Sequence, residues 1–408
     1  MTQTAASVDR HKVSAYKVEA ASELQRILAF WELHAVDEQQ GGFVGEMNND
    51  GQVQAGAPKG AVLNARILWT FAAAYRHSKH EKHLLLARRA YNYLVGHFID
   101  VQHGGVYWEI SAAGEPLNTR KQVYALAFAI YGLSEYHLVT ENQEALKYSQ
   151  QLYEWIEQFS FDKEHGGYFE AFSREGELLE DLRLSPKDRN DPKTMNTHLH
   201  ILEAYANLYR CWPDAQLAQQ LESLIRLFLA KIVDAETGHL QLFFTREWKP
   251  TADLVSYGHD IEASWLLLEA AEVLGKEELT EEVKALSIKM ARATAEGLQQ
   301  DGSLYHELDR SRQQYDTHRE WWVSAEAMVG FLNAYQFTSD PAFLEQSLNS
   351  WAFAQKHLLD KAKGEWLWGV NDDYSPMDEV KIGFWKCPYH NSRACLEVLN
   401  RCQRLLES

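Results

Sequence analysis

The sequence predicts an all-α fold, an (α/α)6 barrel or toroid of six inner and six outer helices with short β-hairpins at one end. Two observations predict it. A hairpin pattern led by glycine recurs six times, and helical periodicity fills the intervals between hairpins. Although 408 residues would ordinarily suggest two or three domains, the repeats predict one catalytic domain, residues 1–408.

The repeated unit begins with glycine, continues as alternating apolar and polar residues, and turns at a short polar segment. It is clearest in GGFVGEMNNDGQV from Gly41 and in GGVYWEISAAGEPL from Gly104. Alternation of period two around such a turn is typical of a β-hairpin. The anchoring glycines are 63, 62, 71, 64 and 62 residues apart, and they are Gly42, Gly105, Gly167, Gly238, Gly302 and Gly364.

Each interval between hairpins holds roughly 45 residues, enough for two helices of ordinary length. In the first interval, residues 61–75 are apolar almost all round, whereas residues 82–98 are apolar along one stripe. The first kind of helix belongs inside and the second outside. A helix at about residues 14–34 and a last one after Pro388 bring the number to twelve. Closing the ring covers every inner face and brings the first helix against the last.

Composition excludes several classes of partner. The chain carries 40 Lys and Arg against 58 Asp and Glu, a net charge of −18 that repels phosphate backbones and anionic membrane surfaces. We therefore expect neither nucleic acid nor membrane as a partner. Four cysteines without paired spacing indicate reduced thiols, and residues 1–15 lack the apolar core of a secretory signal. These features predict a cytoplasmic protein, and we also expect a monomer.

Polar and aromatic residues interrupt the apolar inner helices near their starts. One such residue is more often a helix cap or a satisfied buried group than a functional one. Interruptions at the corresponding end of all six inner helices favour a shared pocket, because the ring turns all six helix starts toward one cavity. The interrupting residues are Asn64, Arg66, Tyr124, Asn196, His200, His259, Glu262, Trp321, Trp322, Glu326 and His390.

The spacing of these residues indicates proton transfer. His259 and Glu262 are three residues apart, so both lie on one helix face, where a carboxylate raises the basicity of an imidazole. Histidines on opposite walls of a cavity suit removal and return of a proton α to a carbonyl. The resulting enediolate needs positive charge and hydrogen-bond donors, which Arg66 and Tyr124 could supply with His200.

Other kinds of site are compatible with the same residues. His200, His259, Glu262 and His390 could bind a metal ion, but Arg66 and two tryptophans suit an anionic sugar intermediate better than a cation. A glycosidase would use Glu262 and Glu326, and a sugar-binding protein would need no opposed histidines. The chain has no nucleotide-binding motif. We expect no metal and no cofactor.

Five of the six inner helices carry long motifs, namely VLNARILWTFAAAY from Val62, TRKQVYALAFAIYGLSEY from Thr119, MNTHLHILEAYANLYR from Met195, GHDIEASWLLLEA from Gly258 and FWKCPYHNSRACLE from Phe384. These motifs resemble the cellobiose 2-epimerase family of the N-acylglucosamine 2-epimerase superfamily. The resemblance covers essentially the whole chain. It implies an (α/α)6 barrel that epimerises the reducing-end glucose of β-1,4-linked disaccharides to mannose, without cofactor, through ring opening and a cis-enediolate. Cellobiose, lactose and mannobiose-type sugars are the expected partners.

The resemblance also implies roles for individual residues. His259 and His390 correspond to the acid and base at C2, and His200 to a third histidine that assists proton movement or ring opening. Arg66 and Tyr124 correspond to groups that bind the enediolate oxygens. Relatives that act on monosaccharides, either N-acylglucosamine 2-epimerases or mannose-type aldose–ketose isomerases, stay open as an alternative. The residues that position the substrate, directly or through the groups that contact it, correspond to Asn64, Asn196, Glu262, Trp322 and Glu326. The resemblance implies that the sugar away from the reducing end contacts Ser185, Asp188 and Trp385. Trp321 is the remaining residue expected at the substrate.

Overall fold

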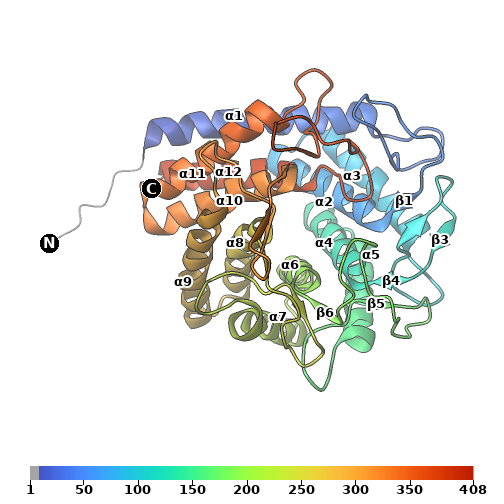
Figure 1. Ribbon diagram of the computed structural model, residues 1–408. Coiled ribbons are helices and arrows are strands. Elements are labelled where there is room, and N and C mark those ends of the chain that lie inside the picture. Colours follow the sequence, from blue (N-terminus) through green and yellow to red (C-terminus); the bar gives the residue numbers. More distant parts are fainter. Residues whose placement is uncertain (1–8, 408) are drawn as a thin grey trace.

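Six inner helices stand side by side around a central axis in a computed structural model that describes residues 9–407 (Figure 1). Each inner helix contacts the next, and α12 contacts α2, so the ring is closed. Their apolar sequences explain their position, since nearly every side chain in the first four turns of α2, α4 and α10 is buried. The inner helices are α2 (Ala61–Ser78), α4 (Val123–Thr140), α6 (Met195–Cys211), α8 (Tyr257–Leu274), α10 (Trp321–Thr338) and α12 (Tyr389–Glu407).

An outer helix packs against each inner helix. Five of them follow their inner partner in the chain, whereas α1 packs against α12 and so joins the two ends of the described chain. The predicted (α/α)6 toroid of twelve helices is thus confirmed for residues 9–407. The outer helices are α1 (Arg10–His34), α3 (Glu81–Tyr93), α5 (Gln143–Trp155), α7 (Ala215–Leu227), α9 (Glu277–Thr294) and α11 (Pro341–Phe353).

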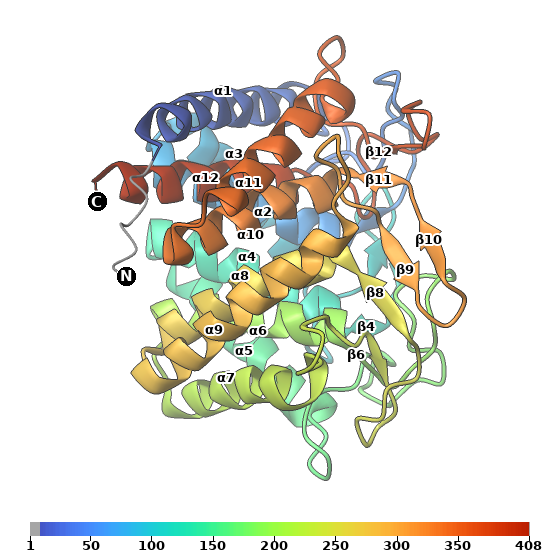
Figure 2. The same cartoon turned by 60° about the vertical axis from the view of Figure 1, so that its left-hand side comes forward.

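A collar of short antiparallel strands covers one end of the ring (Figure 2). The strand that leads into an inner helix pairs with the hairpin of the following repeat, as β1 with β2 and β11 with β12. A bridge between Met47 and Ile382 joins the first hairpin to the segment before α12 and closes the collar. The strands are β1 (Lys59–Gly60), β2 (Glu109–Ile110), β3 (Pro116–Asn118), β4 (Lys121–Gln122), β5 (Ala171–Phe172), β6 (Lys193–Thr194), β7 (Phe243–Phe244), β8 (Leu254–Ser256), β9 (Glu307–Asp309), β10 (Gln314–Asp316), β11 (Arg319–Glu320) and β12 (Gly369–Val370).

All six predicted hairpins are present. Two are strand pairs, β2 with β3 and β9 with β10, and each of the others is held by an antiparallel bridge such as that between Phe172 and Leu178. Gly167 shows why the pattern begins with glycine. Its φ is +74°, and a Cβ there would lie 2.8 Å from Nε2 of His198 and 2.3 Å from the ring of Trp248. Only glycine lets the hairpin approach the inner helix this closely.

A buried lysine ties the collar to the turns, a feature that the sequence analysis did not anticipate. At β6, Lys193 is fully buried and its Nζ lies 3.0 Å from Oδ2 of Asp162, whose Oδ1 accepts N–H groups of the turn before Gly167. Three other repeats have the same pair. The Nζ–Oδ2 distances are 2.8 Å for Lys59–Asp37, 2.9 Å for Lys121–Asp100 and 2.5 Å for Lys381–Asp360.

Within residues 9–407, no helix combines the length and the apolar character that a bilayer crossing requires.

Replacing Lys193 by methionine should lower the free energy of unfolding by about 3 kcal/mol or more, because it removes one partner of a buried ion pair. Arg246 offers a matched control, since it binds the same Asp162 but its side chain is 45% exposed. Arg246→Met should cost at most about 1 kcal/mol. Urea unfolding measures the free energy of unfolding of both variants. An equal loss in the two variants would show that the burial of Lys193 does not determine the strength of its ion pair.

Candidate active site

A cavity of about 220 Å³ lies where the inner helices meet the collar. Helix starts and collar loops provide its walls, so residues far apart in sequence come together there. Of the fourteen residues predicted for the site, twelve line it. The lining residues are Arg66, Tyr124, Leu184, Ser185, Asp188, Asn196, His200, His259, Glu262, Glu320, Trp321, Trp322, Trp368, Trp385 and His390.

Two predicted residues do not line the cavity. The side chain of Asn64 is fully buried, and its amide donates to the carbonyl of Gly60 at 2.9 Å, which secures the first turn of α2. Glu326 is also fully buried and lies beneath His390, so it holds an imidazole from outside the cavity. Asn64 and Glu326 therefore lie where they can position other groups of the site.

His390, at the start of α12, is held by a carboxylate. Its Nδ1 lies 2.7 Å from Oε1 of Glu326, an arrangement in which Nδ1 donates and Nε2 keeps its lone pair. The side chain is buried, and burial lowers the pKa of His390 well below its usual value, although the charge of Glu262 opposes this. At neutral pH the imidazole is uncharged and available as a base.

His259, in the first turn of α8, has a different partner. Its Nδ1 lies 2.8 Å from Oγ of Ser256, a hydroxyl and not a carboxylate. Burial, together with the charges of His200 and His306, lowers the pKa of His259 to about 3. The two imidazoles lie on α8 and α12, the helices on either side of α10. Trp322 of α10 contacts both, with ring centroids 4.8 Å from His259 and 5.8 Å from His390.

His200 is paired with a carboxylate that the sequence analysis overlooked. Glu203 lies three residues further along α6, and its Oε2 is 2.9 Å from Nδ1 of His200. Burial would raise the pKa of Glu203, but Arg393 and His200 outweigh burial and lower it to about 2. The spacing of three residues that drew attention to His259 and Glu262 could have found this pair.

Arg393 binds three buried carboxylates beneath the cavity. Its Nη2 donates to Oε1 of Glu262 and to Oε1 of Glu326, both at 2.6 Å, and its Nη1 donates to Glu203. Glu203, Glu262 and Glu326 come from α6, α8 and α10, so one side chain of α12 links four inner helices. The side chain of Arg393 is 2% exposed. Arg393 comes three residues after His390 and so lies on the same helix face. This spacing alone did not identify Arg393, because its three carboxylate partners are on other helices.

Arg66 of α2 brings the positive charge that lines the cavity itself. Its Nη2 donates to the hydroxyl of Tyr124 at 2.9 Å, and its guanidinium lies 4.1 Å from the ring centroid of Phe128. Its Nε is buried without a hydrogen-bond partner. Burial raises the pKa of Tyr124, which keeps the phenol protonated and able to donate. The pair offers a cation and an O–H group to an anionic ligand.

The sequence profile that defines the N-acylglucosamine 2-epimerase (GlcNAc 2-epimerase) family matches residues 41–394. The chain belongs to this family. A cellobiose 2-epimerase from Bacteroides fragilis is 50% identical over 94% of this chain and 98% of its own length. The solved structure of a cellobiose 2-epimerase from Bacillus thermoamylovorans has a TM-score of 0.92 and 42% identity, covering 95% of this chain and all of its own. A D-mannose isomerase from Marinomonas mediterranea is 22% identical over 93% of this chain and 95% of its own length.

One group of ligand-type side chains lies at the cavity of this member of the N-acylglucosamine 2-epimerase family, and it differs from the set that the sequence suggested. Glu262, Glu326 and His390 offer ligand atoms within 4.8 Å of one another. Arg393, however, already places a guanidinium nitrogen 2.6 Å from an oxygen of each carboxylate, and His390 uses its Nδ1 on Glu326. The donor set is thus satisfied by a permanent cation. These three groups do not fit a metal ion.

The rim of the cavity is built by the long loop that lengthens the third repeat. Ser185 and Asp188 form a tight turn there, in which Oδ2 of Asp188 accepts the N–H of Ser185 at 2.8 Å. Trp385 stands near Tyr124, with ring centroids 5.9 Å apart and planes nearly perpendicular. An exposed polar turn and a half-buried indole are groups that bind a sugar ring by hydrogen bonding and stacking.

Three lining residues were not predicted from the sequence. Leu184 precedes the turn at the rim, whereas Glu320 and Trp368 come from β11 and the last hairpin. The indole of Trp368 donates to Oε1 of Glu320 at 3.1 Å, and that of Trp322 donates to Oε2 at 2.5 Å. Glu320 directly precedes the Trp321–Trp322 pair, and this position is the one feature of the sequence that could have placed Glu320 at the cavity.

We predict that His259 and His390 both remain neutral at pH 6, because burial disfavours their charged forms. Nitrogen-15 NMR of histidine side chains tests this, with His259→Asn and His390→Asn assigning the signals. Since unfolded histidines bind protons near pH 6.5, stability should be complete above that pH and fall below it. Each histidine would remove up to about 2 kcal/mol at pH 5. Titration of either signal near pH 6.5 would contradict the prediction.

Proposed function

We propose that this protein epimerises C2 of the reducing-end glucose of β-1,4-linked disaccharides such as cellobiose and lactose, without a cofactor. One observation carries the proposal. Two neutral imidazoles line one cavity from helices on either side of Trp322, next to a cationic pair of Arg66 and Tyr124. Such a cavity suits a reaction that removes a proton from carbon and returns it to the opposite face.

The proton transfers follow from the two histidine settings. In the ring-opened sugar, C2 lies next to the C1 aldehyde and its proton is acidic enough for an imidazole to remove. One histidine takes that proton, and the electron pair forms the C1–C2 double bond while O1 becomes anionic. The other histidine takes up a proton from water and delivers it to C2 from the opposite face, and the first histidine, now an imidazolium, releases its proton to water. His390 and His259 fill these two roles, and the epimer leaves with its atoms otherwise unchanged.

The charge that develops on O1 and O2 needs stabilisation. Arg66 supplies a permanent cation and Tyr124 an O–H donor, and their mutual hydrogen bond of 2.9 Å fixes both. His200 lies close by, with its ring centroid 5.0 Å from that of Tyr124. Because Glu203 holds its Nδ1, the Nε2 of His200 is left to exchange protons with sugar oxygens during ring opening.

The disaccharide preference rests on the rim and on the relatives. Trp385, Ser185 and Asp188 line the cavity beside the reacting centre, where a second sugar ring would lie. The relative at 50% identity carries the name cellobiose 2-epimerase, whereas the one named D-mannose isomerase is only 22% identical. A disaccharide is therefore a better candidate than a free monosaccharide.

Glycoside hydrolysis finds less support in the same geometry. A hydrolase needs two carboxyl groups that flank the scissile bond and act independently. Glu262 and Glu326 accept hydrogen bonds from the same nitrogen of Arg393, and Glu326 lies beneath His390. Neither arrangement leaves a free acid and a free base.

Incubation with cellobiose in deuterated water tests the reaction. We expect the mannose epimer to carry one deuterium at C2, and returned cellobiose to acquire deuterium there more slowly, as judged by NMR and mass spectrometry. The same assay with mannose and N-acetylmannosamine separates the monosaccharide alternatives. Release of glucose would indicate a hydrolase, and epimer formed without deuterium at C2 would exclude the enediolate.

Glu326→Gln should lower kcat for epimerisation by about 10² or more with little change in KM, because the neutral amide no longer stabilises protonated His390. Glu157→Gln is the matched control. Glu157 is a largely buried carboxylate that accepts from Tyr168 and Tyr205 and does not line the cavity. Its substitution should leave kcat unchanged. If Glu326→Gln kept normal turnover while folded, the proposed role of Glu326 would be wrong.

A further inference from the structure

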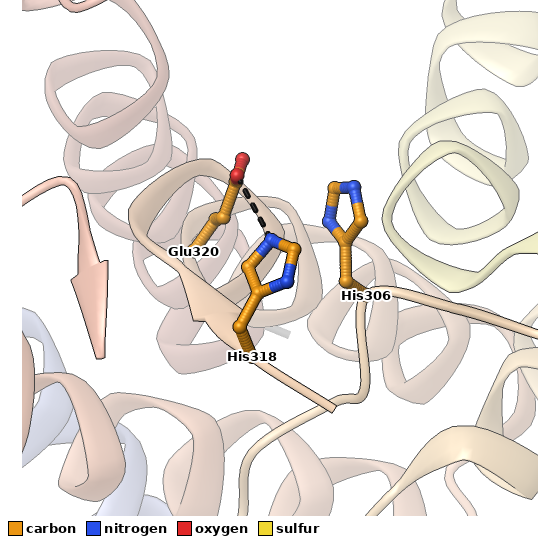
Figure 3. A group of neighbouring side chains, drawn as sticks. All are labelled: His306, His318 and Glu320. Atoms are coloured by element: carbon orange, nitrogen blue, oxygen red, sulfur yellow. Dashed lines mark hydrogen bonds and ion pairs between the residues drawn. The ribbon is translucent and has the colours of Figure 1, made fainter. Parts of the chain in front are cut away.

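A second group of ligand-type side chains lies at the edge of the collar (Figure 3). His306 immediately precedes β9, His318 lies between β10 and β11, and Glu320 ends β11. The backbone fixes their relation, because the N–H of His306 donates to the carbonyl of Asp316 at 3.1 Å and β9 pairs with β10. The two imidazoles therefore lie side by side next to this strand pair, with ring centroids 4.4 Å apart.

The three side chains present their donor atoms to one point. One ligand atom from each lies within 4.8 Å of the others. Nε2 of His318 is 3.1 Å from Oε1 of Glu320, whereas Nδ1 of His306 is buried and has no hydrogen-bond partner. Figure 3 shows the His306 ring beside the linked pair. An orphaned ring nitrogen next to a histidine and a carboxylate lacks a partner that a cation would provide.

We propose that His306, His318 and Glu320 bind a divalent transition-metal ion, with Zn²⁺ the best match. Two imidazole nitrogens and one carboxylate oxygen are a recurrent zinc ligand set, and they leave a fourth position for water. The side chains are 19%, 22% and 13% exposed, so an ion can enter from solvent. This inference does not rest on the proposed epimerisation, although Glu320 also lines the active-site cavity.

Neighbouring groups orient two of the ligands. Nδ1 of His318 lies 2.5 Å from Oδ1 of Asp316, so a carboxylate holds the ring nitrogen opposite the one facing Glu320. The indoles of Trp322 and Trp368 donate to the two oxygens of Glu320 and fix its plane. This contrasts with the group of Glu262, Glu326 and His390, where Arg393 already supplies the positive charge.

A proton competes with the ion. Burial lowers the pKa of His318, but Glu320 and Asp316 outweigh burial and raise it to about 9, so the metal-free ring is an imidazolium that bridges two carboxylates. Binding at His318 Nε2 must release that proton. The rival interpretation is that His318 serves only as this charged bridge, in which case His306 would contribute nothing to zinc affinity.

Isothermal titration of the chelator-treated full chain with ZnCl₂, at pH 8 in a non-coordinating buffer, tests the site. We expect one Zn²⁺ per chain at this site, with binding weakened at least about 10-fold by His306→Ala and by His318→Ala. Zinc should also raise the thermal unfolding midpoint of the unsubstituted protein by a few degrees at saturating concentration, and that of both variants by less.

The chain provides a matched control in another histidine pair. His80 and His83 have ring centroids 5.2 Å apart on an outer surface, so His83→Ala removes a comparable imidazole without touching the collar. His83→Ala should keep the site. Co²⁺ absorption in the visible range reports the ligand field independently and should change in the collar variants alone. Equal zinc affinity in the unsubstituted chain, a folded His306→Ala and a folded His318→Ala would overturn the proposal.

Discussion

The buried guanidinium of Arg393 is the interaction on which the rest of the site depends. It compensates Glu203, Glu262 and Glu326, three carboxylates that extend from separate inner helices into the middle of the ring. Without a cation there, three like charges would share a low-dielectric space at a cost of several kcal/mol. Because α12 supplies that cation, the last inner helix fixes the positions of α6, α8 and α10 as well as closing the ring.

The carboxylates in turn give the histidines different electrostatic surroundings. His390 touches Glu326, and His200 touches Glu203, so either ring would be stabilised by an adjacent anion on taking up a proton. The Nδ1 of His259 instead lies beside the hydroxyl of Ser256. An acid–base pair that works in both directions benefits from such unequal settings, since they make one ring readier than the other to take up a proton. His259 and His390 have the same side chain, so any difference in their readiness to take up a proton comes from the groups around them.

The sequence predicts the ring well because the signal repeats. Six hairpins and the alternation of apolar with amphipathic helices leave few other ways to bury the inner faces, and polar residues at helix starts point to one end. Partners across the ring are harder to predict. Arg393 is visible only as a residue three positions after His390, and nothing local indicates that it meets Glu203, 190 positions earlier. The spacing of Glu326 does not say whether its side chain reaches the cavity or lies beneath it. The lysine–aspartate pairs were not predicted, because their partners are far apart in sequence, 22 positions for Lys59 and Asp37 and 31 positions for Lys193 and Asp162.

The order of the helices along the chain has a consequence for biosynthesis. α12 follows the other five inner helices, so a ribosome makes their carboxylates well before it makes Arg393. At typical elongation rates of about 5–20 residues per second, the nascent ring passes several seconds with its anions uncompensated and the seam between α1 and α2 uncovered. Protonation, water or a chaperone must accommodate those groups in the interval. The docking of α12 is thus the step that turns an open, hydrated arc of helices into a finished protein, and it delivers a catalytic-site imidazole in the same event.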